Sequence, residues 1–245
     1  MKSDEINASA KFYGTAIGKV NAQIIGSSCA AVNLEMLEKH GSFSSAVFMG
    51  LGDGSLLEQI GPRFSKITVL EASDYLVAQA RRQFGGMRGL EIVSTYFEAY
   101  QPAPEQKVSC ILGNHVLEHL DDPVQVLRRS LGWLKTDGIA IFTVPSATSL
   151  HRRIGVNLGL LNRVYDLSEQ DRIVGHRRVY DAANLHADIV AAGYALVESG
   201  GFNLKLVSQA QMLGWPESLH EAIYRVSRDC PPEICSNLYV VCRPN

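Results

Sequence analysis

The chain has 245 residues, of which 46% are hydrophobic, and this amount of apolar side chain suits one sizeable core. Its net charge of −2 argues against a nucleic-acid partner, because no basic field is available to attract phosphates. The sequence contains no apolar run long enough to span a membrane and no apolar stretch after Met1, so we expect a cytoplasmic protein without a membrane anchor or signal peptide.

Residues 1–45 are predicted to be mostly helical, because Ala and Leu are enriched toward the end of this segment. The segment precedes the first predicted strand, as a lid over a site would. Tyr13 is the main lid candidate, with a catalytic or acceptor-contacting role for its ring, and ordinary packing is the alternative. The five cysteines contain no C-x-x-C pair and are expected to be reduced thiols.

The most informative segment is a predicted strand at residues 46–50 that continues into Gly50-Leu51-Gly52-Asp53-Gly54 and a short helix ending near Ile60. Three alternate glycines allow a sharp turn and the close approach of a ligand. The helix start offers free N–H groups to that ligand. The turn therefore predicts a nucleoside-like cofactor, although a tight strand-to-helix connection is the simpler alternative.

A second strand at residues 67–71 ends in Glu71-Ala72, and an acid at this distance from the turn is suited to accept hydrogen bonds from ribose hydroxyls. A helix over residues 75–84 and a strand over residues 91–95 follow. The next strand is predicted at residues 108–113, a helix at residues 122–134, and a fifth strand at residues 139–144. Strands that alternate with helices predict an α/β fold with a doubly wound, mostly parallel sheet.

The segment from His115 to His119 also matches the H-x-x-E-H pattern of some zinc proteases. Its position directly after a strand argues against a zinc-binding helix, and we predict no metal. His119 is expected to pack or to cap.

Together, the turn from Gly50 to Gly54, Glu71 and the segment from Asn114 to Pro123 resemble class I S-adenosylmethionine-dependent methyltransferases. The resemblance covers roughly residues 43–207 and implies a seven-stranded Rossmann-like sheet. The cofactor would be S-adenosyl-L-methionine, with S-adenosyl-L-homocysteine as the product. The residues implied or expected to contact the cofactor are Gly50, Leu51, Gly52, Gly54, Glu71, Ala72, Phe97, Glu98, Asn114 and His115.

In this family Phe97 and Glu98 would line the adenine, and His115 would lie beside the methyl group as a candidate base. Two positions depart from the family pattern. Phe48 stands where many members have an acid before the first glycine, and Ser109 stands near the start of the fourth strand where many have another acid.

Residues 147–180 interrupt the alternation, with a helix expected over residues 149–161, and such excursions often shape a substrate pocket. Paired basic residues here are suited to polar or anionic groups, so we expect substrate contacts from His151, Arg152, His176 and Arg177, with His176 also a catalytic candidate. A helix at residues 181–192, a strand at 195–199, a helix from Glu217 and a strand at 238–242 complete the chain.

We therefore predict one domain: a lid (1–45), a cofactor-binding core (46–146), a substrate-side insertion (147–180) and the end of the sheet (181–245). The predicted activity is methyl transfer to an oxygen or nitrogen of a small metabolite, such as a secondary metabolite or sugar derivative, by a monomer or homodimer. A non-catalytic S-adenosylmethionine-binding protein is the alternative, motivated by Phe48 and Ser109. A nicotinamide-dependent oxidoreductase is disfavoured, because Ser55 replaces the third glycine of a dinucleotide-binding turn.

Overall fold

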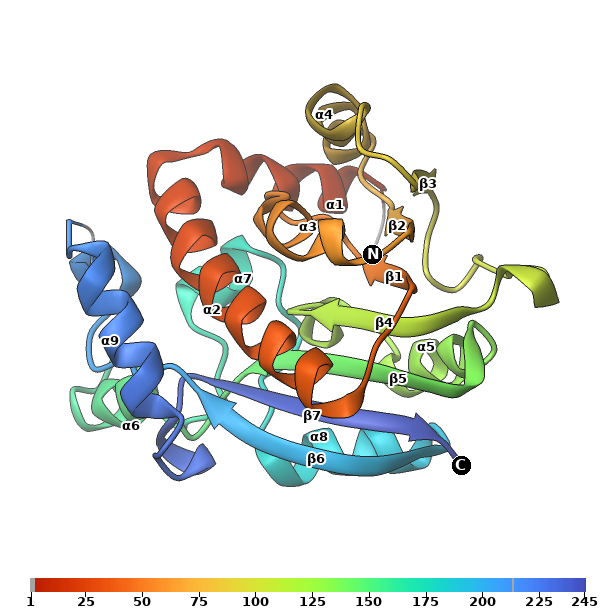
Figure 1. Ribbon diagram of the computed structural model, residues 1–245. Helices are drawn as coiled ribbons and strands as arrows, with labels where there is room; N and C mark the ends of the chain where they lie inside the picture. The colour runs from red at the N-terminus through yellow and green to blue at the C-terminus, as the bar shows by residue number, and fades with distance from the viewer. Residues whose placement is uncertain (1–2, 213) are drawn as a thin grey trace.

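The computed structural model describes residues 3–212 and 214–245, and its centre is a seven-stranded sheet with the order β3-β2-β1-β4-β5-β7-β6 (Figure 1). Strand β7 runs antiparallel to both of its neighbours, and the other paired strands are parallel. The strands are β1 Ser45–Met49, β2 Lys66–Glu71, β3 Leu90–Ser94, β4 Val108–Asn114, β5 Leu134–Pro145, β6 Tyr194–Phe202 and β7 Asn237–Pro244. This confirms the predicted doubly wound, mostly parallel α/β fold.

Helices lie on both faces of the sheet, which is what connections between parallel strands require. The α-helices are α1 Ser3–Ala10, α2 Ala16–His40, α3 Ser55–Ile60, α4 Asp74–Phe84, α5 Pro123–Leu131, α6 Leu150–Asn157, α7 Glu169–Ile173, α8 Ala182–Ala191 and α9 Glu217–Ser227. The 3₁₀ turns are η1 Lys11–Gly14, η2 Gly61–Arg63, η3 Pro104–Gln106, η4 Leu117–His119, η5 Gln209–Met212 and η6 Pro232–Ile234.

Alternate side chains of each strand enter two separate cores. In β1, Ala46 and Phe48 pack with α2, α3 and α4, whereas Val47 and Met49 pack on the side of α5 and α8. Buried strands with two apolar faces read as continuous hydrophobic runs, as β1 does. The burial of both faces fixes the register of β1 and therefore the place where its glycine turn begins.

The N-terminal segment has two parts with different surroundings. The second half of α2 belongs to the core, where Cys29, Val32 and Met36 are buried against the sheet. The first part, α1 and η1, lies near the ends of β2 and α4, and Asn7 Oδ1 accepts a hydrogen bond of 2.8 Å from Ser73 Oγ. Because the second half of α2 is part of the core, only α1 and η1 remain candidates for the lid. Their role as a lid stays a prediction.

Two predicted helices are shorter than expected. The helix predicted for residues 122–134 ends at Leu131, because the turn at Gly132 lets Leu134 start β5 by pairing with Val108. The helix predicted to reach Leu161 ends at Asn157, and Gly159 follows with a φ of 72°. Helix α7 was not predicted.

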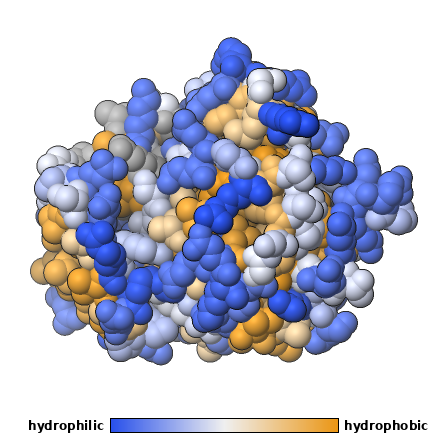
Figure 2. Space-filling model, in the orientation of Figure 1, coloured by the Kyte–Doolittle hydropathy of each residue, from blue (hydrophilic) through white to orange (hydrophobic). Residues whose placement is uncertain are grey.

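The surface mixes hydrophilic and hydrophobic residues, and hydrophobic ones are visible where Figure 1 places α6 and α9 (Figure 2). These two helices carry exposed Ile154, Leu219 and Val226. Within the described residues, no helix combines the length and apolar character that a membrane span requires.

Candidate active site

The turn after β1 leaves open space above its middle glycine. Gly50, Gly52 and Gly54 all have positive φ angles, of 80°, 59° and 87°, which disfavour residues with a Cβ. A Cβ on Gly52 would meet no protein atom within 4 Å, whereas one on Gly54 would lie 2.7 Å from the ring of Phe84. Gly52 is therefore positioned for the approach of a ligand, and Gly54 is needed for packing against α4.

Glu71 joins the end of β2 to this turn. Its Oε2 accepts a hydrogen bond of 2.9 Å from the Leu51 N–H, and its Oε1 accepts one of 2.8 Å from the Ser73 N–H. The side chain is almost buried, and burial raises its pKa while these backbone donors act in the opposite direction. A carboxylate has about four acceptor positions, so part of its acceptor capacity remains for ligand hydroxyls.

The start of α3 contributes less than expected. Asp53 Oδ1 accepts hydrogen bonds from both the N–H and the hydroxyl of Ser55, at 3.1 and 2.7 Å. The first N–H group of the helix is therefore already used by the protein, so the prediction of N–H groups free for a ligand does not hold for Ser55.

Asn114, the last residue of β4, presents an unused donor. Its Oδ1 accepts hydrogen bonds from Asn33 Nδ2 at 2.7 Å and from Thr143 Oγ1 at 3.1 Å. Its buried Nδ2 has no hydrogen-bond partner among the described residues. Because buried polar groups normally find partners, this amide is a candidate ligand contact.

His115 makes the turn out of β4 in a left-handed conformation with a φ of 52°, which is uncommon for a residue with a side chain. Its N–H donates to the Thr143 carbonyl at 2.9 Å. The turn also neighbours the glycines of β1, since a Cβ on Gly50 would lie 3.8 Å from Val116 Cγ2. Burial lowers the pKa of His115 to about 3, which keeps the imidazole neutral but makes it a weak base.

The insertion holds His176 in a fixed orientation. Its Nδ1 lies 2.9 Å from Asp171 Oδ1, and Asp171 Oδ2 accepts from Arg152 Nη1 at 3.0 Å and from Ser168 Oγ at 2.7 Å. Burial acts to raise the pKa of Asp171, but the hydrogen bonds from His176 and Ser168 outweigh it and hold that pKa well below its usual range. An ionised Asp171 accepts a hydrogen bond from Nδ1 of His176, and this contact leaves Nε2 on the opposite side of the ring.

Arg152, one of the expected substrate contacts, is occupied by the protein itself. It is only 6% exposed, and its guanidinium donates to Asp171 and to the carbonyls of Val164 and Asp166. Asp166 belongs to the wall of a hollow of about 640 Å³, lined by residues 159–163, 165–167 and Arg172. Arg152 thus fixes the shape of the insertion.

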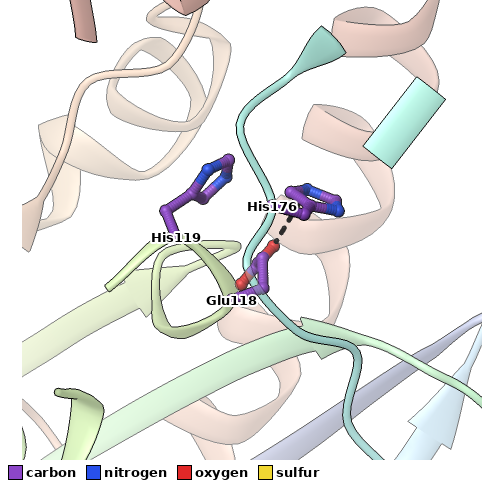
Figure 3. A group of neighbouring side chains, drawn as sticks. All are labelled: Glu118, His119 and His176. Carbon is purple, nitrogen blue, oxygen red and sulfur yellow. Dashed lines mark ion pairs between the residues drawn. The ribbon is translucent and has the colours of Figure 1, made fainter. Parts of the chain in front are cut away.

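Glu118, His119 and His176 converge between η4 and the segment that follows α7 (Figure 3). His176 Nε2 lies 3.8 Å from Glu118 Oε1, and the rings of His119 and His176 are 4.7 Å apart between centroids. Burial raises the pKa of Glu118 to about 7 and lowers that of His119 to about 3. His115, which precedes η4, places its Nδ1 3.5 Å from the same Glu118 oxygen.

A model of a family described as a methyltransferase domain matches residues 23–199, more than two thirds of the chain. The chain belongs to this methyltransferase family. Its sheet order and motifs confirm the resemblance to the class I enzymes, whose cofactor is S-adenosyl-L-methionine. No curated protein matches the chain.

Solved structures share the fold of this methyltransferase at low sequence identity. One belongs to the complex of the Haloferax volcanii Trm112 methyltransferase activator and the putative methyltransferase (TM-score 0.66, 16% identity, covering 99% of this chain and 97% of that one). Another is the plantazolicin methyltransferase BamL with a substrate analogue and S-adenosylhomocysteine (TM-score 0.63, 15% identity, 99% and 96%). A third is the N-methyltransferase NodS of Bradyrhizobium japonicum with S-adenosyl-L-homocysteine (TM-score 0.57, 13% identity, 88% and 85%).

The two departures from the family pattern have structural explanations. The side chain of Phe48 points into the core, where its ring packs edge-on against Phe64 at 6.1 Å between centroids. Ser109 lies at the start of β4, and its hydroxyl donates to the Ser45 carbonyl at 2.9 Å. That contact is at the opposite edge of the sheet from the glycine turn, so Ser109 does not border the cofactor site of this methyltransferase.

The remaining predicted residues lie in several different segments of the chain. Phe97 packs partly buried against the core beside α5, and Glu98 follows it in a turn. Arg177 forms an ion pair of 2.9 Å with Asp121, and burial lowers the pKa of His151 to about 3. Tyr13 lies in η1, but its side chain falls outside the described part of the chain.

Three residues of the site had no functional role predicted from the sequence. Asp171 had a local signal, since Ser168 and Asp171 form a capping box at the start of α7. Asn33 gave none, because its contact with Asn114 joins positions 81 residues apart in the sequence. Glu118 was noted within a motif, but its burial between histidines comes from the tertiary structure.

Proposed function

We propose that this methyltransferase transfers a methyl group from S-adenosyl-L-methionine to an oxygen or nitrogen of a small metabolite, such as a secondary metabolite or sugar derivative. The observation that carries the proposal is the open space above Gly52, bordered by a carboxylate that is tied to the backbone of the same turn. A nucleoside fits this combination, because its ribose meets an acceptor where the backbone can be approached closely.

The cofactor would be held by the turn from Gly50 to Gly54, by Glu71 with Ala72, and by the unused amide donor of Asn114. Phe97 and Glu98 are proposed for the adenine. When bound, S-adenosylmethionine supplies a methyl group on a positively charged sulfur and leaves as S-adenosylhomocysteine. Most of the rate enhancement would come from orientation of the two reactants.

The acceptor would enter from the side of the insertion. His115 and His176 are the proposed catalytic groups, because both imidazoles border the space beside Glu118. His151 and Arg177 are proposed to contact the acceptor, and Tyr13 to close over it. Arg152 is proposed as a positioning residue, since its donors are used within the protein.

Two of the structural relatives are described as an N-methyltransferase and as the plantazolicin methyltransferase, and they support a small acceptor by analogy of fold alone.

The direct test is calorimetric titration with S-adenosylhomocysteine, followed by incubation with isotopically labelled S-adenosylmethionine and a panel of hydroxylated and amine-bearing metabolites. We expect one nucleoside per chain and label transfer to at least one acceptor class. Absence of nucleoside binding to the folded protein would overturn the proposal, and binding without transfer to any acceptor would favour a non-catalytic binding protein.

A further inference from the structure

Glu118 is a buried acid whose charge the cofactor site does not use. Its side chain is 0% exposed, and neither carboxylate oxygen has a hydrogen-bond partner among the described residues. A buried carboxylate without hydrogen bonds is costly, and its nearest imidazole nitrogens are 3.5 and 3.8 Å away, so the site needs a proton or a closer cation to be stable. The side chains around Glu118 decide between a proton and a cation.

Two histidines converge on Glu118 from different parts of the chain. His119 is its neighbour on η4, and His176 comes from the segment after α7 (Figure 3). One ligand atom from each of the three residues lies within 4.8 Å of the others. A carboxylate oxygen with two imidazole nitrogens is a ligand set typical of zinc and other first-row transition metals.

His176 is prepared to be a ligand by the residues behind it. Asp171 holds its Nδ1 at 2.9 Å and is itself held by Arg152 and Ser168. Histidines that bind metals almost always donate their other ring N–H to a carboxylate or carbonyl in this way. The arrangement directs Nε2 toward Glu118 Oε1, 3.8 Å away.

We propose that Glu118, His119 and His176 bind one divalent transition-metal ion, for which Zn²⁺ is the probe. Ligands about 2.0–2.1 Å from a tetrahedral ion lie about 3.4 Å apart, so ligand atoms that lie within 4.8 Å of one another need to approach by at most about 1.4 Å. Three protein ligands leave a coordination position open. This deepens the proposed function and rests on it in one respect, namely that the open position receives an oxygen of the methyl acceptor.

The ion explains the site better than a proton does. A protonated Glu118 would donate a hydrogen bond, yet the nearest imidazole nitrogens are 3.5 and 3.8 Å away, which is too long. A cation would satisfy the carboxylate and both imidazole lone pairs together. No metal was predicted from the sequence, because the H-x-x-E-H pattern follows a strand and does not lie in a protease-like helix. In the structure the third ligand, His176, comes from the insertion.

The test is Zn²⁺ titration of chelator-treated, dialysed protein, by calorimetry and by competition with a chromophoric chelator. A Cys230→Ser background removes the one cysteine that is not buried. We expect one Zn²⁺ per chain, a loss of about 100-fold or more in affinity for Glu118→Gln and for His119→Gln, and a loss of about 10–100-fold for Asp171→Asn. His220→Gln is the matched control, because that histidine belongs to α9 and its ring stacks on Trp215.

Circular dichroism confirms that each variant is folded, and Co²⁺ absorption of the parent protein reports the ligands independently of any variant. We expect a d–d spectrum of nitrogen and oxygen ligands without thiolate charge-transfer bands. No Zn²⁺ binding, or binding unchanged in both Glu118→Gln and His119→Gln, would overturn the inference. S-adenosylhomocysteine binding measured in parallel separates the proposals. Nucleoside binding without Zn²⁺ binding defeats only the metal site. Zn²⁺ binding without nucleoside binding defeats the proposed function and the acceptor role of the open position, and leaves the metal site itself.

Discussion

Gly52 and Gly159 are a natural comparison at the scale of single residues. Both have positive φ angles, of 59° and 72°, and at both a Cβ would meet no atom within 4 Å. They differ in position, because Gly52 belongs to the turn after β1 and Gly159 to the insertion. The strain of a side chain is therefore similar at the two sites, while only one of them borders the proposed cofactor.

We predict that Gly52→Ala abolishes S-adenosylhomocysteine binding in a folded protein, whereas Gly159→Ala leaves the affinity unchanged. Each substitution should cost about 1–2 kcal/mol of stability from the left-handed backbone. Calorimetric titration and urea unfolding of both variants check this. Equal nucleoside affinity in the two variants would show that the turn is not the binding site.

Glu71 is proposed to act on the cofactor both directly and through the backbone of the turn. We predict that Glu71→Ala weakens S-adenosylhomocysteine binding by about 1–3 kcal/mol, because charge-assisted hydrogen bonds to ribose and to the Leu51 N–H are lost together. Glu91→Ala, on the exposed side of β3, is the control. Titration calorimetry gives both values, and full affinity in Glu71→Ala would place the ribose elsewhere.

At the scale of elements, the insertion between β5 and α8 is held by a buried ion pair instead of a large apolar core. Arg152 from α6 reaches Asp171 of α7 and the backbone of the segment between these helices. Short helices such as α7 are not stable alone, so tertiary contacts of this kind must hold them. The orientation of His176 depends on the same pair.

We predict that Arg152→Met destabilises the protein by about 3–5 kcal/mol, because it leaves Asp171 buried without its cation. Arg153→Met should change stability by less than about 0.5 kcal/mol, since the neighbouring arginine is exposed. Urea unfolding of both variants measures the difference. Similar stabilities would mean that the Arg152 pair does not hold the insertion.

At the scale of the whole molecule, buried charges set the pH dependence of stability. Lys205, just after β6, is partly buried near Asp171 and Arg152, and burial lowers its pKa from the usual 10.5 to about 8. Because the folded pKa is below the unfolded one, the unfolded chain binds more protons between pH 8 and pH 10.5. The contribution of Lys205 to stability therefore rises with pH through this window.

We predict that Lys205→Met stabilises the protein by about 1–3 kcal/mol at pH 7 and that this advantage shrinks as the pH is raised toward 10. Denaturant unfolding of the parent protein and the variant at several pH values provides the test. A pH-independent difference would show that Lys205 is not desolvated in the folded state.

The sequence by itself determined the alternating pattern of strands and helices, the glycine turn and the acid at the end of β2. These features are local, because strand periodicity and the backbone freedom of glycine are properties of neighbouring residues. Glu71 and His115 lie at the same edge of the sheet because, in the doubly wound topology, the carboxyl ends of parallel strands share one edge.

Only the tertiary structure decided how the chemistry-bearing side chains are paired. Asn33 meets Asn114 across 81 residues of sequence, and Asp171 fixes His176 beside Glu118, which lies in a different element. Such contacts depend on burial and on the packing of segments that are distant in the chain, and neither is encoded in a local pattern. For the same reason, Arg152 was predicted from the sequence to contact a substrate, whereas in the fold its charge is paired with Asp171.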